Sequence, residues 1–421
     1  MTTKTTSTSL PEPPRLYRWL VLLMVGSAMF ANYYVFDALN PVGPLLESEL
    51  HFSQAQIGLL DTAYNIAALL VLIAGGFIID RFGTKKSLAV FAVISGLGGF
   101  LIALGSKFEI MMAGRFVLGL GSEPLIVAVT TALAKWFKGK ELSFAMGVNL
   151  TIARFGSFAA DNTRSWAASL YSGWQPVLLF AAGIGAIAIV TSLLYWYLES
   201  RATKMYTLGQ AGSTDKLVFS DLMTFGTSYW WVVGLCVTFY SAVFPFRRFA
   251  NLFLTDAHHL SPETAGFLNG LLPLTAMVAT PLFGLLADKI GKRSLLMTIG
   301  SALLLPSFLL LAYTSLPVEI PITMIGISFS LVPAVMWPSV AYLVDEKKLG
   351  TAYALMTFCQ QIGWALVAWL IGQLNDWAGA SAANPAGYNP GMILFASLGL
   401  FGFLFSYLLK RSEADATTKT K

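Results

Sequence analysis

Long apolar segments dominate this sequence of 421 residues and constrain its fold more than any other feature. A helix needs about 20 consecutive, mainly apolar residues to cross the hydrocarbon core of a bilayer. The chain offers about twelve such segments, and only 12% of its residues are charged, against about 25% in soluble domains. The sequence therefore predicts an all-α membrane protein with twelve transmembrane helices in a lipid bilayer.

The apolar segments form two groups of six, which a polar segment from Glu199 to Thr227 separates. Two six-helix halves are typical of transporters built from structural repeats. The predicted domains are a tail at 1–16, an N-terminal bundle at 17–199, a linker at 200–227, a C-terminal bundle at 228–410 and a tail at 411–421. The predicted spans lie near residues 17–40, 55–79, 87–106, 110–134, 142–166, 174–198, 228–254, 264–288, 294–315, 319–343, 349–374 and 391–410.

A short charged motif occurs once in each half and supports an internal repeat. It reads Gly-Phe-Ile-Ile-Asp-Arg-Phe-Gly at residues 76–83 and Gly-Leu-Leu-Ala-Asp-Lys-Ile-Gly at residues 284–291, and basic residues follow both copies. Glycine permits sharp turns and close helix packing, and basic residues favour the cytoplasmic side. We expect these loops to brace the cytoplasmic face in the outward-open state, with Arg81 contacting Glu141. The expected gating residues at this face are Asp80, Arg81, Glu141, Asp288 and Lys289.

Lysine and arginine residues predict the orientation in the membrane. They concentrate in the central linker and in the loops after the second, fourth, eighth, tenth and twelfth spans, whereas the opposite loops are acidic. Because short cytoplasmic loops carry the excess of basic residues, both termini are expected in the cytoplasm. No sorting motif is visible, and the Asn-Leu-Thr triplet at residues 149–151 lies inside the fifth span. These features favour the cytoplasmic (inner) membrane of a prokaryote.

Several function classes do not fit this sequence. The basic residues are scattered and form no nucleic-acid footprint, despite a formal net charge of +5. The three histidines lack ligand spacing, so neither a metal nor a cofactor is expected. A phosphate-binding Gly-x-x-x-x-Gly-Lys-Ser/Thr motif is missing, and no cluster of His, Ser or paired Asp residues indicates an enzyme. The sequence gives no indication about an accessory subunit.

The twelve predicted spans, the paired charged loops and the sequence Arg-Phe-Val-Leu-Gly-Leu-Gly at residues 115–121 together resemble the major facilitator superfamily. The resemblance covers nearly the whole chain. It implies the major facilitator fold with two six-helix pseudo-repeats. It also implies a secondary transporter that alternates access to a central site.

Four stretches refine this resemblance: Gly-Arg-Phe-Val-Leu-Gly-Leu-Gly-Ser-Glu-Pro at residues 114–124, Trp-Phe-Lys-Gly-Lys-Glu-Leu at 136–142, Ala-Arg-Phe-Gly-Ser at 153–157 and Val-Phe-Pro-Phe at 243–246. They resemble the lysosomal dipeptide transporters of the superfamily and their prokaryotic relatives. The resemblance implies that Glu123 in the fourth span and Arg154 in the fifth hold the charged termini of a dipeptide. The chain departs from that group in lacking an acidic-dileucine sorting signal.

Glu123 and Arg154 also stand out without the resemblance, because a charge in the middle of a membrane helix costs about 2.5 to 3.5 kcal/mol. At 1.5 Å per residue, Glu123 lies about 18 Å and Arg154 about 20 Å from the cytoplasmic ends of their spans, near the midplane. One interpretation is a permanent ion pair between two helices. The other is a zwitterion site, in which the planar fork of Arg154 binds a carboxylate and Glu123 binds an ammonium group.

Further charges are expected in the outer third of the membrane, where Asp37 of the first span and Arg247 or Arg248 of the seventh lie at similar depth. They are predicted to meet across the cavity as an outer gate or a secondary substrate contact. The alternative for Arg248 is snorkelling to the interface. Arg115 is interpreted as an internal charge partner, with a role in proton coupling as the alternative. Four other residues are interpreted as polarity at helix ends, with an outer vestibule as the alternative: Asp61, Asn65, Asp161 and Arg164.

Aromatic and amide side chains near mid-depth are candidates for the cavity wall. Several polar groups at one depth indicate a surface that faces a cavity. The competing interpretation is packing against lipid or neighbouring helices. The candidates for substrate contact are Tyr33, Tyr34, Tyr240, Trp337, Gln361 and Trp364, with Asn32 and Gln360 beside them.

The combined prediction is a secondary transporter that moves a small zwitterionic solute, a dipeptide or an amino acid, by rocking of its two halves. It works as a uniporter or with protons as coupling ion, since a buried carboxylate such as Glu123 can take up a proton. Two alternatives stay open. An organic-anion or nitrate-like porter would clamp its substrate with Arg154 and Arg247 or Arg248, and a non-transporting membrane receptor would keep the same fold.

Overall fold

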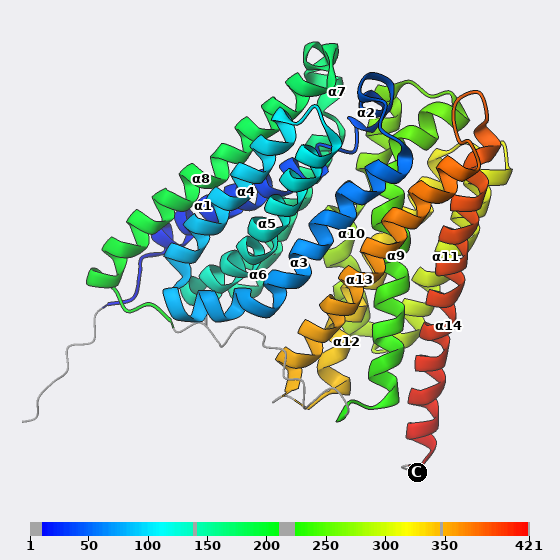
Figure 1. The fold of residues 1–421 in the computed structure, drawn as a ribbon. Coiled ribbons are helices and arrows are strands. Elements are labelled where there is room, and N and C mark those ends of the chain that lie inside the picture. The colour runs from blue at the N-terminus through cyan, green and yellow to red at the C-terminus, as the bar shows by residue number, and fades with distance from the viewer. Residues whose placement is uncertain (1–10, 138–140, 210–223, 346–347, 420–421) are drawn as a thin grey trace, which may run out of the picture.

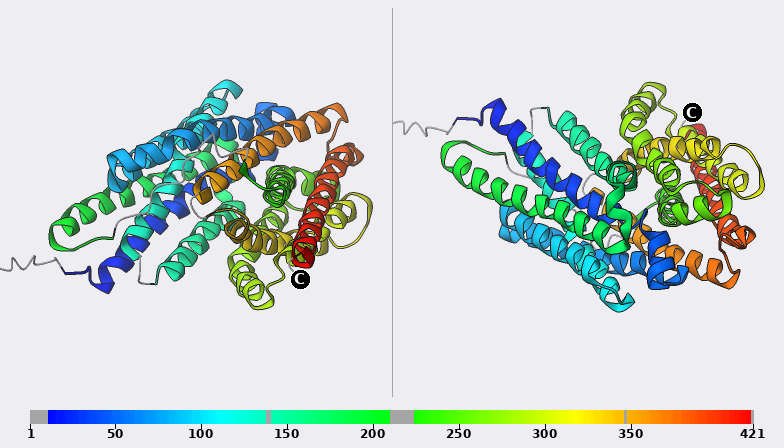
Figure 2. Two further views of the ribbon diagram at one scale, coloured as in Figure 1. Left: turned by 90° about the horizontal axis from the view of Figure 1, so that it is seen from below. Right: turned by 90° about the horizontal axis from the view of Figure 1, so that it is seen from above.

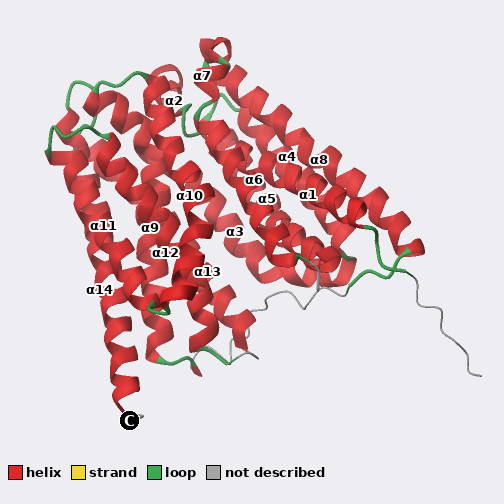
Figure 3. Cartoon of the chain, turned by 180° about the vertical axis from the view of Figure 1, so that it is seen from behind, coloured by secondary structure: helices red, strands yellow, loops and turns green. Residues whose placement is uncertain are grey.

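The computed structural model describes residues 11–137, 141–209, 224–345 and 348–419, apart from the side chains at 73–77, 80 and 413–419. Its regular elements are helices, except for one isolated β-bridge between Ser381 and Asn384, so the predicted all-α fold is confirmed (Figure 3). The long helices of this part are α1 (Arg15–Asp37), α3 (Gln54–Phe82), α4 (Thr84–Leu104), α5 (Phe108–Phe137), α6 (Leu142–Asp161), α8 (Trp174–Met205), α9 (Thr227–His258), α10 (Pro262–Ile290), α11 (Arg293–Tyr313), α12 (Glu319–Leu343), α13 (Leu349–Trp377) and α14 (Asn389–Lys419).

Eleven helices in the described residues are long and apolar enough to cross a membrane. The remaining long helix is α6, whose Asn149, Arg154 and Asp161 lower its hydropathy. Asn149 and Asp161 are buried and Arg154 lines a cavity, so none of these polar groups needs to face lipid. Such residues are tolerated in membrane helices when they face the interior of the bundle. Since α6 packs against α1 and α10, it supplies the twelfth crossing.

The long helices form two bundles of six, seen from the side in Figure 1 and from both ends in Figure 2. The N-terminal bundle runs from α1 to α8 and the C-terminal bundle from α9 to α14, and they meet mainly through α3 against α13 and α6 against α10. We call the side on which α1 begins and α14 ends the terminal face. The opposite face carries the short helices α2 (Gly43–Leu50) and α7 (Thr163–Trp166). Figure 1 shows that the bundles approach each other at the opposite face and diverge towards the terminal face.

The start of α3 is fixed by contacts from both bundles. The Ser53 side chain accepts a hydrogen bond from the Gln56 backbone N–H at 3.2 Å, and the Gln56 side chain accepts one from the Ser53 N–H at 2.9 Å. The carboxylate of Asp376 in α13 accepts the backbone N–H groups of Gln54 and Ala55 at 2.9 and 2.8 Å. A carboxylate at a helix N-terminus satisfies free N–H donors and interacts favourably with the helix dipole. This cap therefore joins the two bundles at the opposite face.

Glycines allow the backbones of the two bundles to touch near the opposite face. A Cβ atom on Gly58 of α3 would clash with the backbone carbonyl of Ala368 in α13. A Cβ atom on Gly266 of α10 would lie 2.5 Å from the carbonyl oxygen of Asp161 in α6. Small residues at such positions permit the close approach on which helix association in membranes depends. The present closure of the opposite face thus requires glycine at both interfaces.

We expect Gly266→Leu to shift the population about 5- to 150-fold away from this closed arrangement, because overpacking costs about 1 to 3 kcal/mol. The measurement is the distance between spin labels on cysteines introduced at Ser172 and Thr314, two exposed positions at the opposite face. The background lacks the native Cys236 and Cys359. Gly183→Leu is the matched control, since a Cβ atom there meets nothing within 4 Å. An unchanged distance distribution in Gly266→Leu would contradict the prediction.

Candidate functional site

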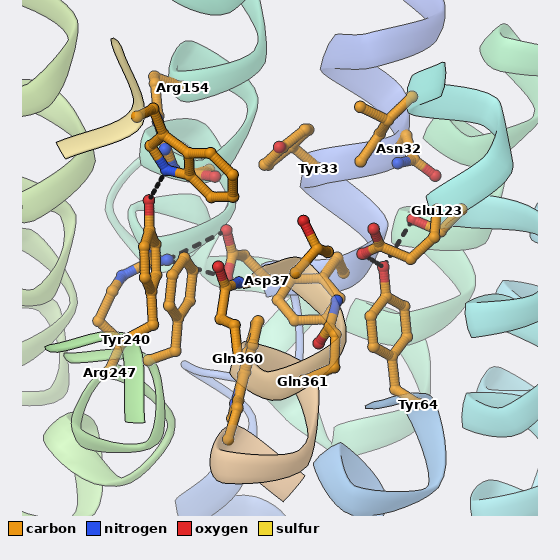
Figure 4. Close-up of a pocket in the computed structure, with 18 residues that line it drawn as sticks. Asn32, Tyr33, Asp37, Tyr64, Glu123, Arg154, Tyr240, Arg247, Gln360 and Gln361 are labelled. Atoms are coloured by element: carbon orange, nitrogen blue, oxygen red, sulfur yellow. Dashed lines mark hydrogen bonds and ion pairs between the residues drawn. The ribbon is translucent and has the colours of Figure 1, made fainter. Parts of the chain in front are cut away.

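A central cavity of about 220 Å³ lies between the two bundles. Its wall combines charged, amide and aromatic side chains, as Figure 4 shows. Polar groups placed on an otherwise apolar wall are typical of small-molecule sites. The lining residues are Asn32, Tyr33, Phe36 and Asp37 of α1, Tyr64 of α3, Ser122, Glu123 and Ile126 of α5, Arg154 and Ser157 of α6, Tyr240, Phe244 and Arg247 of α9, Trp337 of α12, and Thr357, Gln360, Gln361 and Trp364 of α13.

Glu123 lies in the middle of α5, directly before Pro124. Proline has no backbone N–H, so the helix loses one internal hydrogen bond at this point. The Tyr64 hydroxyl of α3 donates a hydrogen bond to Oε1 of Glu123 at 2.8 Å and lies 3.0 Å from Oγ of Ser122. Glu123 forms no ion pair with a cation in the described part of the chain. Its carboxylate is therefore oriented by Tyr64 but not neutralised.

Arg154 enters the cavity from α6. Its guanidinium carbon lies 5.0 Å from the ring centre of Phe329 and 5.9 Å from that of Tyr33. A cation over an aromatic ring is stabilised by about 0.5 to 2 kcal/mol, and the N–H fork stays free for a ligand. Arg154 has no acidic partner within ion-pair distance among the described residues, Glu123 included. The permanent ion pair between these two residues, one of the two interpretations of the sequence, is thus not formed.

Six buried charges form a connected group on the side of the cavity that faces the opposite face, and two of them, Asp37 and Arg247, line the cavity. We call the group the paired-arginine network: Asp37, Asp61, Asp161, Arg115, Arg247 and Arg248. Within it, Arg247 donates from Nη1 to Asp37 Oδ1 at 3.2 Å and from Nη2 to Asp161 Oδ2 at 2.7 Å. Asn40 donates to both carboxylates, at 3.1 and 2.9 Å. The predicted meeting of Asp37 with Arg247 is present in the structure.

The second part of the network centres on Asp61. Nη2 of Arg248 in α9 lies 2.7 Å from Asp61 Oδ1, and Nη2 of Arg115 in α5 lies 2.6 Å from the same oxygen. None of the side chains in the network is more than 3% exposed. The three carboxylates belong to the N-terminal bundle, whereas Arg247 and Arg248 belong to α9. The network is balanced in charge and joins the two bundles.

Several expectations about these charges need correction. Arg248 does not line the cavity or snorkel to the interface, because it is buried against Asp61. Asp61 and Asp161 are not simple polarity at helix ends but partners in buried ion pairs. Arg164 Nε lies 2.7 Å from Glu263 Oε1 of α10, so this ion pair also joins the two bundles. The sequence did indicate that Asp61 needs a partner, because it falls inside an apolar segment, where an unpaired charge is costly.

Among the aromatic and amide candidates, the cavity brings together Tyr33, Tyr240, Trp337, Gln361 and Trp364. Trp337 Nε1 donates to the Tyr240 hydroxyl at 2.9 Å. Phe244, which was not predicted, stacks on Trp364 with ring centres 4.2 Å apart. The rings of Tyr240, Phe244, Trp337 and Trp364 contact one another and form an aromatic wall on the side of the C-terminal bundle.

Tyr34 was predicted to contact substrate, but it does not line the cavity. It is 1% exposed, and its hydroxyl lies 2.6 Å from Thr163 Oγ1 inside the N-terminal bundle. Successive residues of an α-helix point about 100° apart, because one turn contains 3.6 residues. The α1 residues that line the cavity, Asn32, Tyr33, Phe36 and Asp37, lie on one side of the helix, and Tyr34 points away from that side.

The residues predicted to brace the terminal face are separated in this conformation. Arg81 lies over the ring of Phe82 at 5.7 Å, and Glu141 pairs with Arg15 at 2.6 Å, so the Arg81 to Glu141 contact expected for the other state is not formed. Asp288 pairs with Arg293 at 2.8 Å, and Lys289 is exposed. The side chain of Asp80 lies outside the described residues.

Comparison with solved structures supports the fold of a transporter. The chain superposes on the nucleoside transporter NupG with a TM-score of 0.76 at 13% identity, covering 92% of this chain and 99% of that one. A bacterial homologue of the human lysosomal transporter Spinster, in its inward-facing and unoccupied conformation, gives a TM-score of 0.75 at 18% identity, covering 95% and 98%.

Sequence comparison identifies the family. The lysosomal dipeptide transporter MFSD1 of Homo sapiens is 32% identical over 96% of this chain and 89% of its own length. The probable sulfoacetate transporter SauU of Cupriavidus necator is 24% identical over 80% of this chain and 83% of its own. The family model for the Major Facilitator Superfamily matches residues 25–250 and 248–421. The chain therefore belongs to the Major Facilitator Superfamily.

Proposed function

We propose that this secondary transporter carries dipeptides by alternating access, with Glu123 binding the substrate ammonium group and Arg154 binding its carboxylate. The observation that carries the proposal is the presence of one unneutralised acid and one unneutralised base in the same cavity. A zwitterion offers the complementary pair of charges. The transporter works as a uniporter or couples to protons, and it resides in a prokaryotic cytoplasmic membrane with both termini in the cytoplasm.

The charge balance of the cavity favours a zwitterion over a simple anion. Asp37 and Arg247 also line the cavity, but each already has a partner in the paired-arginine network. Binding of a zwitterion pairs both remaining charges. An anion would leave the Glu123 carboxylate without a cation, and a desolvated charge without a partner is costly. The human relative named as a dipeptide transporter supports the same choice.

The paired-arginine network suggests how access alternates. We propose that it closes the opposite face, and that the loops with Asp80, Arg81, Asp288 and Lys289 close the terminal face in the other state. With the termini in the cytoplasm, the present conformation is inward-open. In that state the network and the glycine contacts hold the bundles together on the outer side. Rocking about the central site then requires these ion pairs to open.

The proposal is tested by competition for dipeptide uptake into proteoliposomes. Blocking the substrate amine by acetylation or its carboxylate by amidation should weaken competition about 10- to 100-fold, because each charge-assisted hydrogen bond contributes about 1.5 to 3 kcal/mol. The free dipeptide with the same side chains is the matched control. Equal competition by blocked and free dipeptides would show that the termini are not recognised.

An organic-anion porter is the second candidate, favoured by the free guanidinium of Arg154 and by relatives named for sulfoacetate and hexuronate. The two candidates differ at Glu123. Anion uptake that persists in Glu123→Gln would favour the porter, whereas dipeptide uptake lost in the same variant favours the zwitterion site. Ligand binding without any uptake would indicate a receptor.

A further inference from the structure

A second cavity of about 310 Å³ adjoins the central cavity, on the side of Glu123 that faces the terminal face. Five residues line both cavities: Glu123, Ile126, Trp337, Thr357 and Gln361. The remaining lining residues follow Tyr64 in α3 and Glu123 in α5, or precede Gln361 in α13. The helices α3 and α5 run towards the terminal face and α13 runs away from it. The second cavity therefore lies between the central cavity and the terminal face.

The wall of the second cavity is apolar. The residues that line it but not the central cavity carry no charge and are mainly aliphatic: Ala68, Val71, Leu72, Pro124, Val127 and Ala354, together with Tyr353. The Tyr353 hydroxyl donates a hydrogen bond to the Trp337 backbone carbonyl at 3.2 Å, so its donor is already used. A polar or charged side chain placed against this apolar surface would lose hydrogen bonds to water.

Polar atoms occur at the junction of the two cavities. Glu123 presents its carboxylate there, and Gln361, which is 3% exposed, has a side-chain carbonyl oxygen without a hydrogen-bond partner in the described part of the chain. A buried acceptor without a partner is costly unless a ligand supplies a donor. A substrate ammonium group has three N–H donors, enough for a carboxylate and an amide oxygen. Figure 4 shows Glu123 and Gln361 among the residues that line the central cavity.

We propose that the second cavity is the subsite for the side chain of the N-terminal residue of the dipeptide, and that it prefers large apolar side chains. The inference rests on the proposed function. In a dipeptide the ammonium group and the first side chain are bonded to the same carbon atom. An ammonium group held at the junction therefore places the first side chain at the mouth of the second cavity. The second side chain lies next to the carboxylate, and Arg154 does not line the second cavity.

The preference is tested with isomeric dipeptides on the purified full-length protein. Leu-Gly and Gly-Leu have the same composition and charges, and they differ only in the residue that carries the side chain. Burial of a leucine side chain should make Leu-Gly bind about 10- to 100-fold more tightly than Gly-Leu, measured by calorimetry. Lys-Gly, whose side chain would be desolvated without a partner, should bind more weakly than Leu-Gly.

Ala354→Phe should fill the subsite and bring the Leu-Gly to Gly-Leu affinity ratio close to one. A general loss of folding lowers the affinity for both isomers and leaves the ratio unchanged, so the ratio reports the subsite alone. Ala186→Phe on the exposed surface of α8 is the control and should keep the wild-type ratio. Equal affinity of the wild type for both isomers, or a ratio that survives Ala354→Phe, would overturn the subsite. Failure of every free dipeptide to bind would overturn the proposed function itself.

Discussion

Arg154→Ala is expected to reduce dipeptide uptake into proteoliposomes by at least about 30-fold. Removal of one partner of a desolvated, hydrogen-bonded charge pair costs about 2 to 5 kcal/mol. The substrate carboxylate would enter a cavity that keeps the Glu123 carboxylate but no unpaired cation. Arg154→Lys is the matched control. It retains the charge without the planar fork, so its uptake should fall between that of the wild type and that of Arg154→Ala.

The same variant distinguishes recognition of the carboxylate from a structural role. In the wild type a free dipeptide should bind more tightly than its C-terminal amide, and in Arg154→Ala this difference should vanish. Glu123→Gln should instead remove the difference between the free and the N-acetylated dipeptide. Such cycles isolate the contact between one substrate group and one side chain. If Arg154→Ala still prefers the free carboxylate, another group binds it and the assignment to Arg154 is wrong.

The fold could be predicted from the sequence because a bilayer permits few structures. Only helices and closed β-barrels satisfy their backbone polar groups inside a bilayer. Segments of about 20 mainly apolar residues have the length of a spanning helix, whereas a barrel strand needs only about 9 to 11. Simple helix geometry also predicted that Glu123 and Arg154 lie at a similar level, because both helices have charged ends that fix the register. The two residues line the same cavity in the structure.

Helix rotation and pairing between the bundles could not be predicted in the same way. A shift of one residue turns a side chain by about 100°, which decides that Tyr33 faces the cavity and Tyr34 does not. Arg247 and Arg248 are likewise neighbours in sequence but contact different acids, Asp37 and Asp61. Such pairings depend on how α9 packs against the N-terminal bundle, and nothing in the sequence around either arginine specifies it.

The second large effect is expected from a substitution in the paired-arginine network. Arg247→Ala would leave Asp37 and Asp161 buried beside each other without their cation, although Asn40 would still donate to both. Loss of one partner from a buried ion pair costs about 3 to 5 kcal/mol, because the remaining charge stays desolvated. Opening of the opposite face would return both carboxylates to water. We therefore expect the variant to shift the population towards the outward-open state by about 100-fold or more.

The spin labels at Ser172 and Thr314 report this shift in the absence of substrate, and the long distance should dominate in Arg247→Ala. Arg164→Ala is the matched control, since Arg164 joins the same bundles through Glu263 but its side chain is 29% exposed and that of Glu263 is 45% exposed. A pair with that exposure contributes about 0 to 1 kcal/mol, so the control should stay near the wild-type distribution.

A variant without charges at positions 37, 161 and 247 separates an electrostatic gate from one held by hydrogen bonds and packing. Adding Asp37→Asn and Asp161→Asn to Arg247→Ala removes the two uncompensated charges and keeps side chains of similar size. If desolvated charge drives the opening, this triple variant should recover most of the closed population, because neutral side chains at these positions cost less than unpaired carboxylates. Persistent opening in the triple variant would mean that the hydrogen bonds and packing of Arg247 hold the opposite face together. A wild-type distance distribution in Arg247→Ala alone would remove the network from the gate altogether.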